Sequence, residues 1–447
     1  MSSEWPLVRI EDIAANQPSA MATGPFGSSI SAKFFQESGI PVIRGSNLSA
    51  DVQIKIDDSG LVFVSEDKAK EFPRCIVSNG DLVFTCWGTI NQVGLIDDTA
   101  TYQKYLISNK QMKLTVDRTK ADPRFVYYVF SGPTKQSEII ENGIGSSVPG
   151  FNLGQLRKHS FRLPPLEEQA AIADLLDIFS NRIALLRETN ATLEAIVQAL
   201  FKSWFVNLDP VHARARGEEP AGLAPEVAAL FPASFEESEL GIVPKGWRVG
   251  TLADLSDLNP ESWTSRTHPE SVRYVDLANT KDNVIAEVTE FSFEEAPSRA
   301  RRVLRDGDTI VGTVRPGNRS FAFISNASAN LTGSTGFAVL RPRHDRNTEF
   351  VFLAATSDNS IDHLAHVADG GAYPAVRSEV VSGLSCVVPD GDVLCAFHEV
   401  AQPIFNKVAA NHQQAQTLAT LRDTLLPRLI SGQLRLPEAE SLVEATL

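Results

Sequence analysis

Residues 162–204 read RLPPLEEQAAIADLLDIFSNRIALLRETNATLEAIVQALFKSW. After the two prolines, apolar residues recur at alternating intervals of four and three, and Asn190 occupies the remaining slot of the series. This heptad spacing predicts a long helix that pairs with another helix as a left-handed coiled coil. An ordinary helix with one face on a core is the plainer alternative. The series comprises Ile172, Leu176, Phe179, Ile183, Leu186, Leu193, Val197, Leu200 and Trp204.

A second series of the same kind lies near the C-terminus and predicts a second long helix over residues 390–432. Its equivalent position suits it as an antiparallel partner of the first helix. Residues 433–447 then form a short tail. The series comprises Phe397, Ala401, Ile404, Val408, Asn411, Ala415, Leu418, Leu425 and Leu429, with Arg422 off the pattern.

The regions that precede the two helices also repeat. Residues 5–13 (WPLVRIEDI) align with residues 247–255 (WRVGTLADL), and Asn-Gly-Asp at 79–81 aligns with Asp-Gly-Asp at 306–308. Three matches in the same order indicate an internal duplication. The third match has one constant offset and pairs Phe125 with Phe350, Val126 with Val351, Gly145 with Gly370, Pro149 with Pro374 and Pro164 with Pro389.

Short Val/Ile/Phe/Thr runs bounded by Gly, Pro, Asn or Asp predict strands in both regions. Amphipathic segments at 125–140 and 350–364 predict helices, so the class is α+β. Trp5 and Trp247 occupy equivalent places and are interpreted as core residues. The predicted strands are IPVIRG (40–45), GLVFVS (60–65), DLVFTCW (81–87), QMKLTV (111–116), VRYVDL (272–277), DTIVGTV (308–314), SFAFIS (320–325) and GFAVLRP (336–342).

The stretch between the repeats, residues 207–244, is acidic and rich in proline and glycine. We interpret it as an extended linker. The whole chain has 447 residues, of which 43% are hydrophobic and 21% charged. The composition excludes a largely disordered chain, and the length favours two to four domains.

The chain has 41 basic and 55 acidic residues, a net charge of −14. That balance argues against a generic nucleic-acid coat protein, although local basic surfaces stay possible. Four cysteines without a CxxC pair, a charged N-terminus and the lack of a long apolar run favour a cytoplasmic protein.

Motifs of catalysis are missing from the sequence. There is no GxxxxGK[ST] phosphate loop and no Asn-Pro-Pro-aromatic segment, because Asn259-Pro260 is followed by Glu261. His363 and His366 have zinc-like spacing, but no further ligands accompany them. We therefore expect no catalytic residue, metal or cofactor, and a binding protein rather than an enzyme.

Four segments of the sequence are similar to segments of a known protein family. The junction RLPPLEEQ (162–169), the entry FPASFEESELGIVPKGWRVGTLADL (231–255) and the segment GDLVFTCWGTINQVGLI (80–96) resemble those of type I restriction-modification specificity subunits. The C-terminal LRDTLLPRLISGQLRL (421–436) is similar to the close of their second helix. In the second copy VVPDGDVLCAF (387–397) replaces the PPLEEQ motif, and Asn91 stands where the family often has glycine.

The resemblance implies a non-catalytic subunit that recognises double-stranded DNA and binds two methyltransferase subunits, with two motor/nuclease subunits as possible further partners. Each globular part would read one half of a bipartite site, and the helices would set the unread spacer. The implied organisation is a target-recognition domain at 1–163, a spacer helix at 164–206, the linker at 207–244, a second target-recognition domain at 245–389, a second spacer helix at 390–432 and the tail at 433–447.

Two basic clusters within the globular parts suit contact with DNA, although a charged run is often only a solvated face. The first contains Lys104, Lys110, Lys113, Arg118, Lys120 and Arg124, and the second contains Arg299, Arg301, Arg302, Arg305, Arg315 and Arg319. Arginine suits bidentate contact with guanine and phosphate.

DNA contact needs donors for base edges and small or basic residues near phosphates. In the first part the candidates are Gly27, Ser28, Ser29, Arg44, Asn47, Trp87, Asn91, Ser146, Ser147 and Asn152, although Trp87 also suits a core position. In the second part they are Arg266, Arg315, Asn318, Arg319, Tyr373 and Arg377. The candidate partner interface comprises Leu166, Glu168, Gln169, Ile172 and Trp204.

Two other classes of function stay open on the sequence alone. A coiled-coil adaptor that organises proteins without touching DNA would agree with the acidic balance. A nuclease with a sparse, unrecognised site would cleave DNA by itself in the presence of a metal ion.

Overall fold

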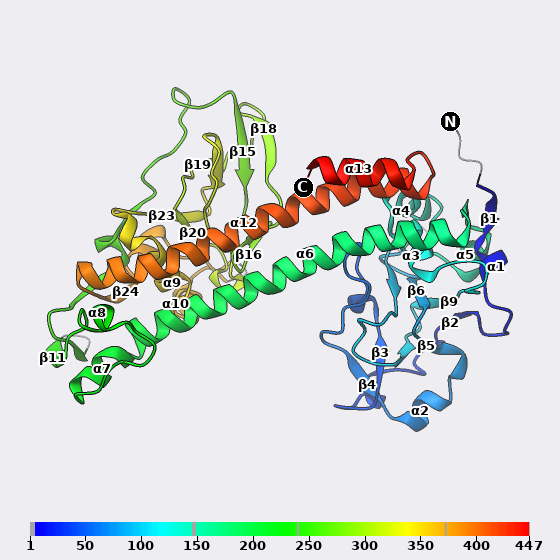
Figure 1. The fold of residues 1–447 in the computed structure, drawn as a ribbon, viewed down its shortest axis with the longest axis horizontal. Coiled ribbons are helices and arrows are strands. Elements are labelled where there is room, and N and C mark those ends of the chain that lie inside the picture. Colours follow the sequence, from blue (N-terminus) through cyan, green and yellow to red (C-terminus); the bar gives the residue numbers. More distant parts are fainter. Residues whose placement is uncertain (1–4, 145–148, 239–240, 372, 447) are drawn as a thin grey trace. The chain divides into compact units, whose positions relative to one another are not determined.

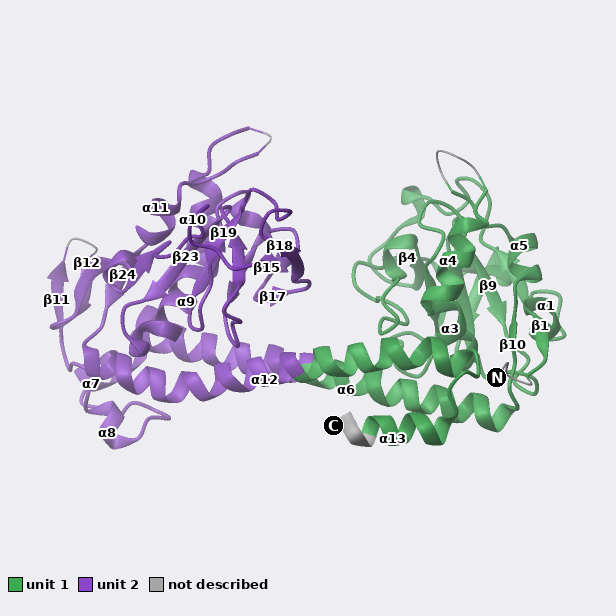
Figure 2. Cartoon of the chain, turned by 90° about the horizontal axis from the view of Figure 1, so that it is seen from above, with its two compact units in different colours: residues 1–186, 414–447 green, residues 187–413 purple. Residues whose placement is uncertain are grey.

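The computed structural model describes residues 5–144, 149–238, 241–371 and 373–446. The chain divides into two compact units, which Figure 2 shows in two colours. The first unit contains residues 1–186 and 414–447, and the second contains residues 187–413. The two long predicted helices are present as α6 (Leu166–Phe201) and α12 (Gly391–Ile430), and each contributes residues to both units. The predicted mixed α/β class with two long helices is therefore confirmed.

The first unit contains two four-stranded sheets, most of whose strands are labelled in Figure 1. One sheet is antiparallel with the order β2-β9-β6-β7, and the other has the order β4-β3-β8-β5 with β3 and β8 parallel. A separate pair, β1–β10, joins the start of this region to its end. The strands are β1 (Leu7–Arg9), β2 (Met21–Thr23), β3 (Ile40–Ile43), β4 (Val62–Val64), β5 (Ile76–Ser78), β6 (Asp81–Thr85), β7 (Val93–Leu95), β8 (Lys104–Ile107), β9 (Gln111–Thr115) and β10 (Ser160–Arg162).

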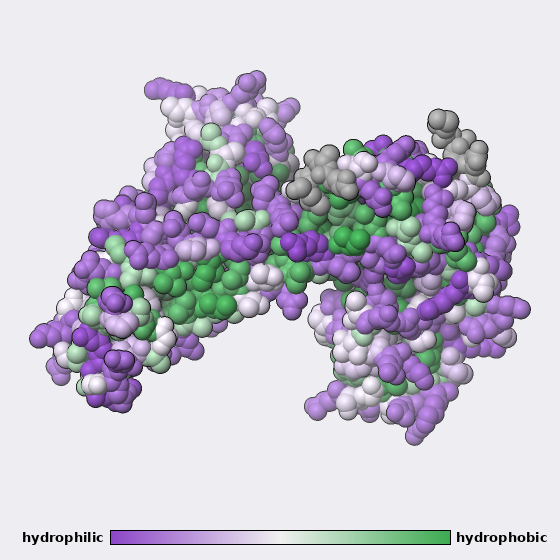
Figure 3. Space-filling model, viewed as in Figure 1, coloured by the Kyte–Doolittle hydropathy of each residue, from purple (hydrophilic) through white to green (hydrophobic). Residues whose placement is uncertain are grey.

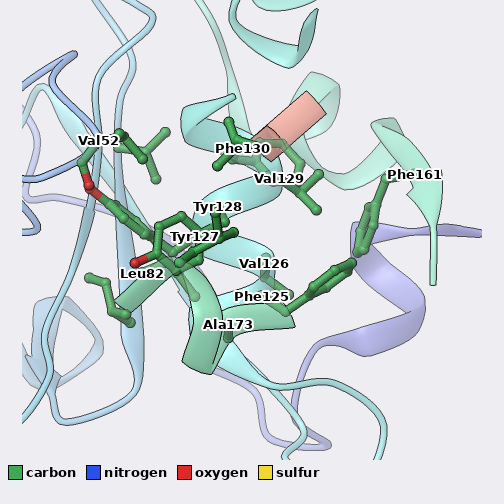
Figure 4. Close-up of a cluster of buried hydrophobic side chains, with 14 of the residues drawn as sticks. Val52, Leu82, Phe125, Val126, Tyr127, Tyr128, Val129, Phe130, Phe161 and Ala173 are labelled. Atoms are coloured by element: carbon green, nitrogen blue, oxygen red, sulfur yellow. The ribbon is translucent and has the colours of Figure 1, made fainter. Parts of the chain in front are cut away.

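Helix α3 (Pro123–Ser131) forms the centre of this unit's largest core. Pro123 at its first turn follows Asp122, whose carboxylate caps the helix by accepting from the Arg124 backbone N–H. Figure 4 shows the aromatic and aliphatic side chains of α3 gathered with Leu82 of β6 and Ala173 of α6. The hydroxyl of buried Tyr127 donates to the Val52 carbonyl over 3.0 Å, so the polar end of the ring is satisfied.

Shorter helices complete the first unit: α1 (Ile10–Ile13), α2 (Glu66–Lys70), α4 (Pro133–Glu141), α5 (Leu153–Lys158) and α13 (Leu436–Thr446). The predicted tail therefore contains a helix. Its apolar residues Leu436, Ala439 and Val443 recur at helical spacing and pack on the same core, where Ala439 is fully buried. Heptad residues of α6 up to Leu186 and of α12 from Ala415 onward share this core.

The second unit repeats the sheet plan with the orders β14-β23-β20-β21 and β18-β15-β22-β19, the latter again with one parallel pair, β15–β22. The predicted duplication is thus confirmed for the two four-stranded sheets. The strands are β11 (Phe235–Ser238), β12 (Gly241–Pro244), β13 (Arg248–Thr251), β14 (Ser256–Leu258), β15 (Ser271–Val275), β16 (Thr280–Lys281), β17 (Val284–Ile285), β18 (Thr289–Ser292), β19 (Ala300–Val303), β20 (Thr309–Gly312), β21 (Phe321–Phe323), β22 (Leu331–Ser334), β23 (Phe337–Pro342) and β24 (Ser385–Val388).

The helices of this unit besides α6 and α12 are α7 (Asp209–Ala215), α8 (Pro225–Ala228), α9 (Thr348–Thr356), α10 (Asp358–Val367) and α11 (Ser378–Ser382). The prediction of an extended linker over 207–244 is wrong, because α7, α8 and the β11–β12 hairpin lie within it. Val211 and Phe231 from this stretch are buried in the unit's core. Their apolar side chains anchor a segment whose acidic, proline-rich composition suggested only a spacer.

The turn before the central strand shows how closely the two copies agree. The carboxylate of buried Asp81 accepts from the Ser78 backbone N–H over 2.8 Å, and that of buried Asp308 accepts from the Arg305 N–H over the same distance. Each turn has a glycine just before the aspartate at positive φ, +91° at Gly80 and +82° at Gly307. The aligned Asn-Gly-Asp and Asp-Gly-Asp motifs therefore form the same turn.

Helices α6 and α12 run antiparallel in the second unit. Asn190 bonds Asn411. Trp204, fourteen residues further along the chain in the helical turn that follows α6, packs on Phe397, fourteen residues before Asn411 in α12, with ring centroids 5.6 Å apart. Trp5 and Trp247 are both buried, as predicted for core positions. Among the described residues, no helix combines the length and the apolar character needed to cross a bilayer.

Candidate nucleic-acid interface

Each unit holds one loop of the same construction after its central strand. In the first unit, the loop that follows β6 is attached to the segment 149–151. The Phe151 N–H donates to the Cys86 carbonyl over 2.9 Å and the Gly88 N–H donates to the Pro149 carbonyl over 3.1 Å. Burial raises the pKa of the Cys86 thiol to about 11, so this cysteine is a neutral residue at the loop's base.

The loop that follows β20 repeats these bonds at the equivalent residues. The Val376 N–H donates to the Thr313 carbonyl over 2.9 Å, and the Arg315 N–H donates to the Pro374 carbonyl over 2.7 Å. We call residues 86–91 the first loop and residues 313–319 the second loop. Loops on a rigid scaffold are where binding residues concentrate.

The first loop borders an open hollow of about 670 Å³. Trp87 is 51% exposed beside it, contrary to the core position that was its alternative interpretation. The ring of Trp87 lies over Gly150, where a Cβ atom would come within 2.6 Å of Cζ3. Polar and basic side chains line the hollow together with apolar ones: Arg44, Thr85, Gln92, Asn109 and Lys110 beside Ile30, Phe35, Val42 and Trp87.

Two predicted contact residues of the first unit have structural roles instead. Asn47 is fully buried, and its amide donates to the carbonyls of Asp57 and Ser59 over 2.9 and 3.1 Å. This corrects its assignment as a DNA contact, because no side-chain atom reaches the surface. Asn152 is exposed, but its side-chain oxygen caps α5 by accepting from the Gln155 N–H. These partners lie on the chain itself, and they explain both residues without DNA.

The other predicted residues of this unit lie on or near the surface. Gly27 has a φ of +60°, its carbonyl accepts from the Asn109 side chain over 3.1 Å, and Ser28 beside it is exposed. The Ser29 hydroxyl donates to the Phe26 carbonyl, and Asn91 is half-buried. Arg44 is half-buried at the hollow and donates to the Gly60 carbonyl over 2.8 Å. Ser146 and Ser147 lie outside the described residues.

The second loop carries a stacked pair. The guanidinium carbon of Arg315 lies 4.6 Å from the centroid of the Tyr373 ring, and Tyr373 is 70% exposed. Asn318 is exposed on the same loop, and Arg377 is exposed at the start of α11. Four of the six predicted residues are thus at this surface. The fifth, Arg266, is exposed on a different segment, between β14 and β15.

Arg319 differs from its neighbours because acidic residues of the chain neutralise it. It pairs with Asp282 over 2.5 Å and with Asp358 over 2.8 Å. These pairs raise the pKa of Arg319 and fix the end of the second loop. Arg319 is therefore better placed to hold the loop than to contact a phosphate.

Both basic clusters are weaker than their sequences suggest, for the same reason. Lys113 is buried and donates to the Ile76 carbonyl, while Arg124 pairs with Asp122, Asp174 and Asp177. In the second cluster Arg305 pairs with Glu261 over 3.0 Å. Asp174, Asp177 and Glu261 lie far from their arginines in the sequence, so a local count of charges does not include them.

Sequence reasoning missed the residues that line the hollow from other elements. Asn109 and Gln111 come from the β8–β9 turn and β9, and the buried Gln111 Nε2 has no hydrogen-bond partner among the described residues. Phe26, beside the predicted Gly27, is 85% exposed. Its place beside Gly27, Ser28 and Ser29 in the segment GPFGSS (24–29) is the signal that the sequence offers.

The candidate partner interface divides between surface and core. Leu166 is 38% exposed, and Glu168 pairs with Arg435 over 3.0 Å. Gln169, Ile172 and Trp204 are buried in the chain's own cores, which corrects their assignment as partner contacts. The Gln169 amide accepts from the Asp122 N–H and donates to the Pro164 carbonyl, so it ties α6 to α3.

No group of three or more His, Cys, Asp or Glu side chains is arranged to hold a metal ion within the described ranges. His363 and His366 both lie on α10. The geometry offers two anchored surface loops with polar, aromatic and basic side chains.

The comparisons with known proteins agree with this picture. Residues 3–195 match the family described as type I restriction modification DNA specificity domain. Two relatives are each 23% identical to the chain. The MjaIX specificity subunit of Methanocaldococcus jannaschii aligns over 97% of this chain and 94% of its own length, and the HindI specificity subunit of Haemophilus influenzae over 74% and 81%.

A solved structure shares the fold. The S subunit of a type I restriction-modification system from M. genitalium superposes with a TM-score of 0.56 at 14% identity and covers 96% of each chain. The predicted resemblance is therefore confirmed. The chain is similar to specificity subunits of type I restriction-modification systems over nearly its whole length.

Proposed function

We propose that this chain is a non-catalytic subunit that reads a bipartite site on duplex DNA, with the regions 1–163 and 245–389 each reading one half. The proposal rests on a comparison of the first loop with the second loop. Equivalent backbone hydrogen bonds hold both loops, but their side chains differ. The first presents Trp87 and Asn91, and the second presents Arg315 and Asn318. Equivalent scaffolds with different donors suit two half-sites of different sequence.

The second part of the proposal is that the long helices set the length of the unread DNA between the two half-sites. A coiled-coil pair has a fixed rise of about 1.5 Å per residue, so its length sets a fixed separation. The buried heptad series in each unit supports this role. The gap would then depend on helix length and not on the recognition loops.

Docking of two methyltransferase subunits, with motor/nuclease subunits as possible additions, completes the proposal. Support comes from apolar side chains left exposed on the helices of each unit. Ile178 and Leu185 of α6 are 63% and 51% exposed in the first unit, and Ile196 and Val400 are 46% and 43% exposed in the second. Figure 3 shows apolar surface on the helical side of the second unit. Exposed apolar helix faces are typical of protein interfaces.

The test is the methylome of a host that expresses this chain with its neighbouring methyltransferase subunit, compared with a host that lacks this chain. A bipartite N6-methyladenine motif that vanishes with the chain would support the proposal and give both half-sites and the gap. Identical methylomes, with an active methyltransferase, would favour the adaptor without DNA recognition. Cleavage of DNA by the purified chain with a divalent metal would contradict the non-catalytic assignment.

A further inference from the structure

Arg315 occupies the position that Gly88 holds in the first copy. Both residues donate their backbone N–H to the carbonyl of an equivalent proline, Pro374 and Pro149 respectively. Arg315 lies two residues after Thr313, and Gly88 lies two residues after Cys86. The carbonyls of Thr313 and Cys86 accept the second anchoring hydrogen bond of each loop. The two backbones therefore take the same course, and the side chain is what differs.

This position has a left-handed backbone in both copies, with φ of +86° at Gly88 and +48° at Arg315. Glycine adopts such a conformation without cost, whereas an arginine is strained there. A Cβ atom at Gly88 would meet nothing within 4 Å, so the first copy has room for a side chain and has none. The strained arginine of the second copy therefore indicates a use for its side chain, since strain of this kind concentrates at functional sites.

The side chain of Arg315 is also ordered by a neighbouring aromatic ring. Its guanidinium stacks at 4.6 Å on the ring of Tyr373, and both side chains are exposed. Stacking on an aromatic ring orders the planar group. The ordered group loses less conformational freedom when it binds a planar acceptor.

Resting on the proposed function, we infer that Arg315 reads a guanine in the half-site bound by residues 245–389, and that Tyr373 positions it. Two parallel N–H groups of arginine match the O6 and N7 acceptors of guanine in the major groove, a geometry that only this base offers. The first loop lacks this contact because Gly88 has no side chain. The two half-sites should then differ at the base pair that faces these equivalent positions.

The experiment is the same methylome measurement, made with R315A, R315G, R315K and Y373L. Arg343 supplies a matched control, because it is an exposed arginine that follows the far end of β23 and pairs with Asp257. With R315A and R315G, discrimination at one guanine of one half-site should fall about 5- to 150-fold, while the other half-site stays unchanged. R315K should lose most of this discrimination, Y373L part of it, and R343A none.

The glycine variant separates recognition from structure. R315G restores the residue of the first copy, so its relaxed backbone should offset the lost stack, and the melting temperature should stay within about 2 °C of the wild type. A fall of about 5 °C or more would make Arg315 a structural residue and overturn the inference. A uniform loss of methylation at all sites, without a change of motif, would also overturn it, because it would mark a phosphate contact.

The failure of this inference and that of the proposed function give different results. If the wild-type chain directs no bipartite motif, the proposed function fails and the Arg315 variants have no motif to change. If the wild-type motif is present and no guanine in it depends on Arg315, only the present inference fails.

Discussion

Asn190 of α6 and Asn411 of α12 form a buried amide pair in which Asn411 Nδ2 donates to Asn190 Oδ1 over 2.8 Å. The Asn190 amide donates in turn to the Val408 carbonyl over 3.1 Å. Both residues stand at heptad positions, most of which hold apolar side chains. A polar pair at such a position favours one alignment of the two helices, because any other alignment would bury each amide against an apolar partner.

The pair gives the first prediction, which concerns stability. N190L leaves the buried Asn411 amide without its partner and should lower the stability of the second unit by about 1–3 kcal/mol. The double variant N190L/N411L replaces both amides with apolar groups and should recover that loss. Thermal denaturation of the two variants and the wild type measures the difference. A double variant that is less stable than the single one would show that the amides contribute beyond their mutual bond.

The second prediction concerns the gap between half-sites. Residues 187–193 of α6 and 408–414 of α12 are facing heptads centred on Asn190 and Asn411. Deletion of both heptads together keeps the remaining apolar positions in phase and shortens the helix pair by about 10 Å. Because B-DNA rises about 34 Å per turn of ten base pairs, the gap should change by about 3 base pairs or methylation should be lost. Methylome sequencing checks this, and an unchanged gap would contradict a ruler role.

The third prediction concerns a network that joins a recognition-region loop to α6 within the first unit. Lys55 Nζ lies 2.8 Å from carboxylate oxygens of both Asp97 and Asp177, and all three side chains are largely buried. The Tyr128 hydroxyl donates to Asp177 over 2.7 Å. K55M removes the cation that the two carboxylates share, and it should cost about 3 kcal/mol at pH 7.

The network also predicts a pH dependence. Burial by itself would raise the pKa of Asp97, but the bond to Lys55 and those to Thr99 hold this pKa below its usual 3.8. A carboxylate with a lowered pKa stabilises the fold above its unfolded value, and that contribution is lost as the pH falls through the folded value. The free energy of unfolding of the wild type should therefore decrease as the pH falls below about 4. K55M should lose this part of the acid dependence, whereas K70M, at the exposed Lys70–Asp67 pair, should keep it.

The fold could be predicted further than the site, and particular residues show why. The strands, the helices and the duplication could be predicted because they depend on local residue spacing and on internal matches such as Asp81 with Asp308, both of which are visible in the sequence. Asn47 and Arg319 look like ordinary surface donors, yet carbonyls of a neighbouring loop satisfy the first, and Asp282 and Asp358 neutralise the second. Such partners are set by tertiary folding, so the residue type alone cannot separate a contact from a support. The prediction for residues 207–244 was wrong for a similar reason. Two apolar residues of this stretch are buried in the core of the second unit, which its acidic composition does not reveal.

The last prediction concerns Trp87, the counterpart of the second loop's Arg–Tyr pair. The ring is half exposed over Gly150, so W87A removes surface rather than core and should change the melting temperature by less than about 2 °C. Under the proposed function it should relax or weaken the half-site read by residues 1–163 and leave the other half-site unchanged. L7A, at an apolar residue of β1 that is 66% exposed, is the matched control and should leave both half-sites unchanged.

Gly150 offers a second route to the same half-site without removing the ring. A Cβ atom there would lie 2.6 Å from Trp87 Cζ3, closer than van der Waals contact permits, so G150A must displace the indole. The backbone at this position is bonded to Ile144 and stays in place more readily than an exposed side chain. G150A should therefore reproduce the methylome change of W87A, and the double variant W87A/G150A should add little to either. Additive effects would place the role of this loop in its backbone rather than in the tryptophan.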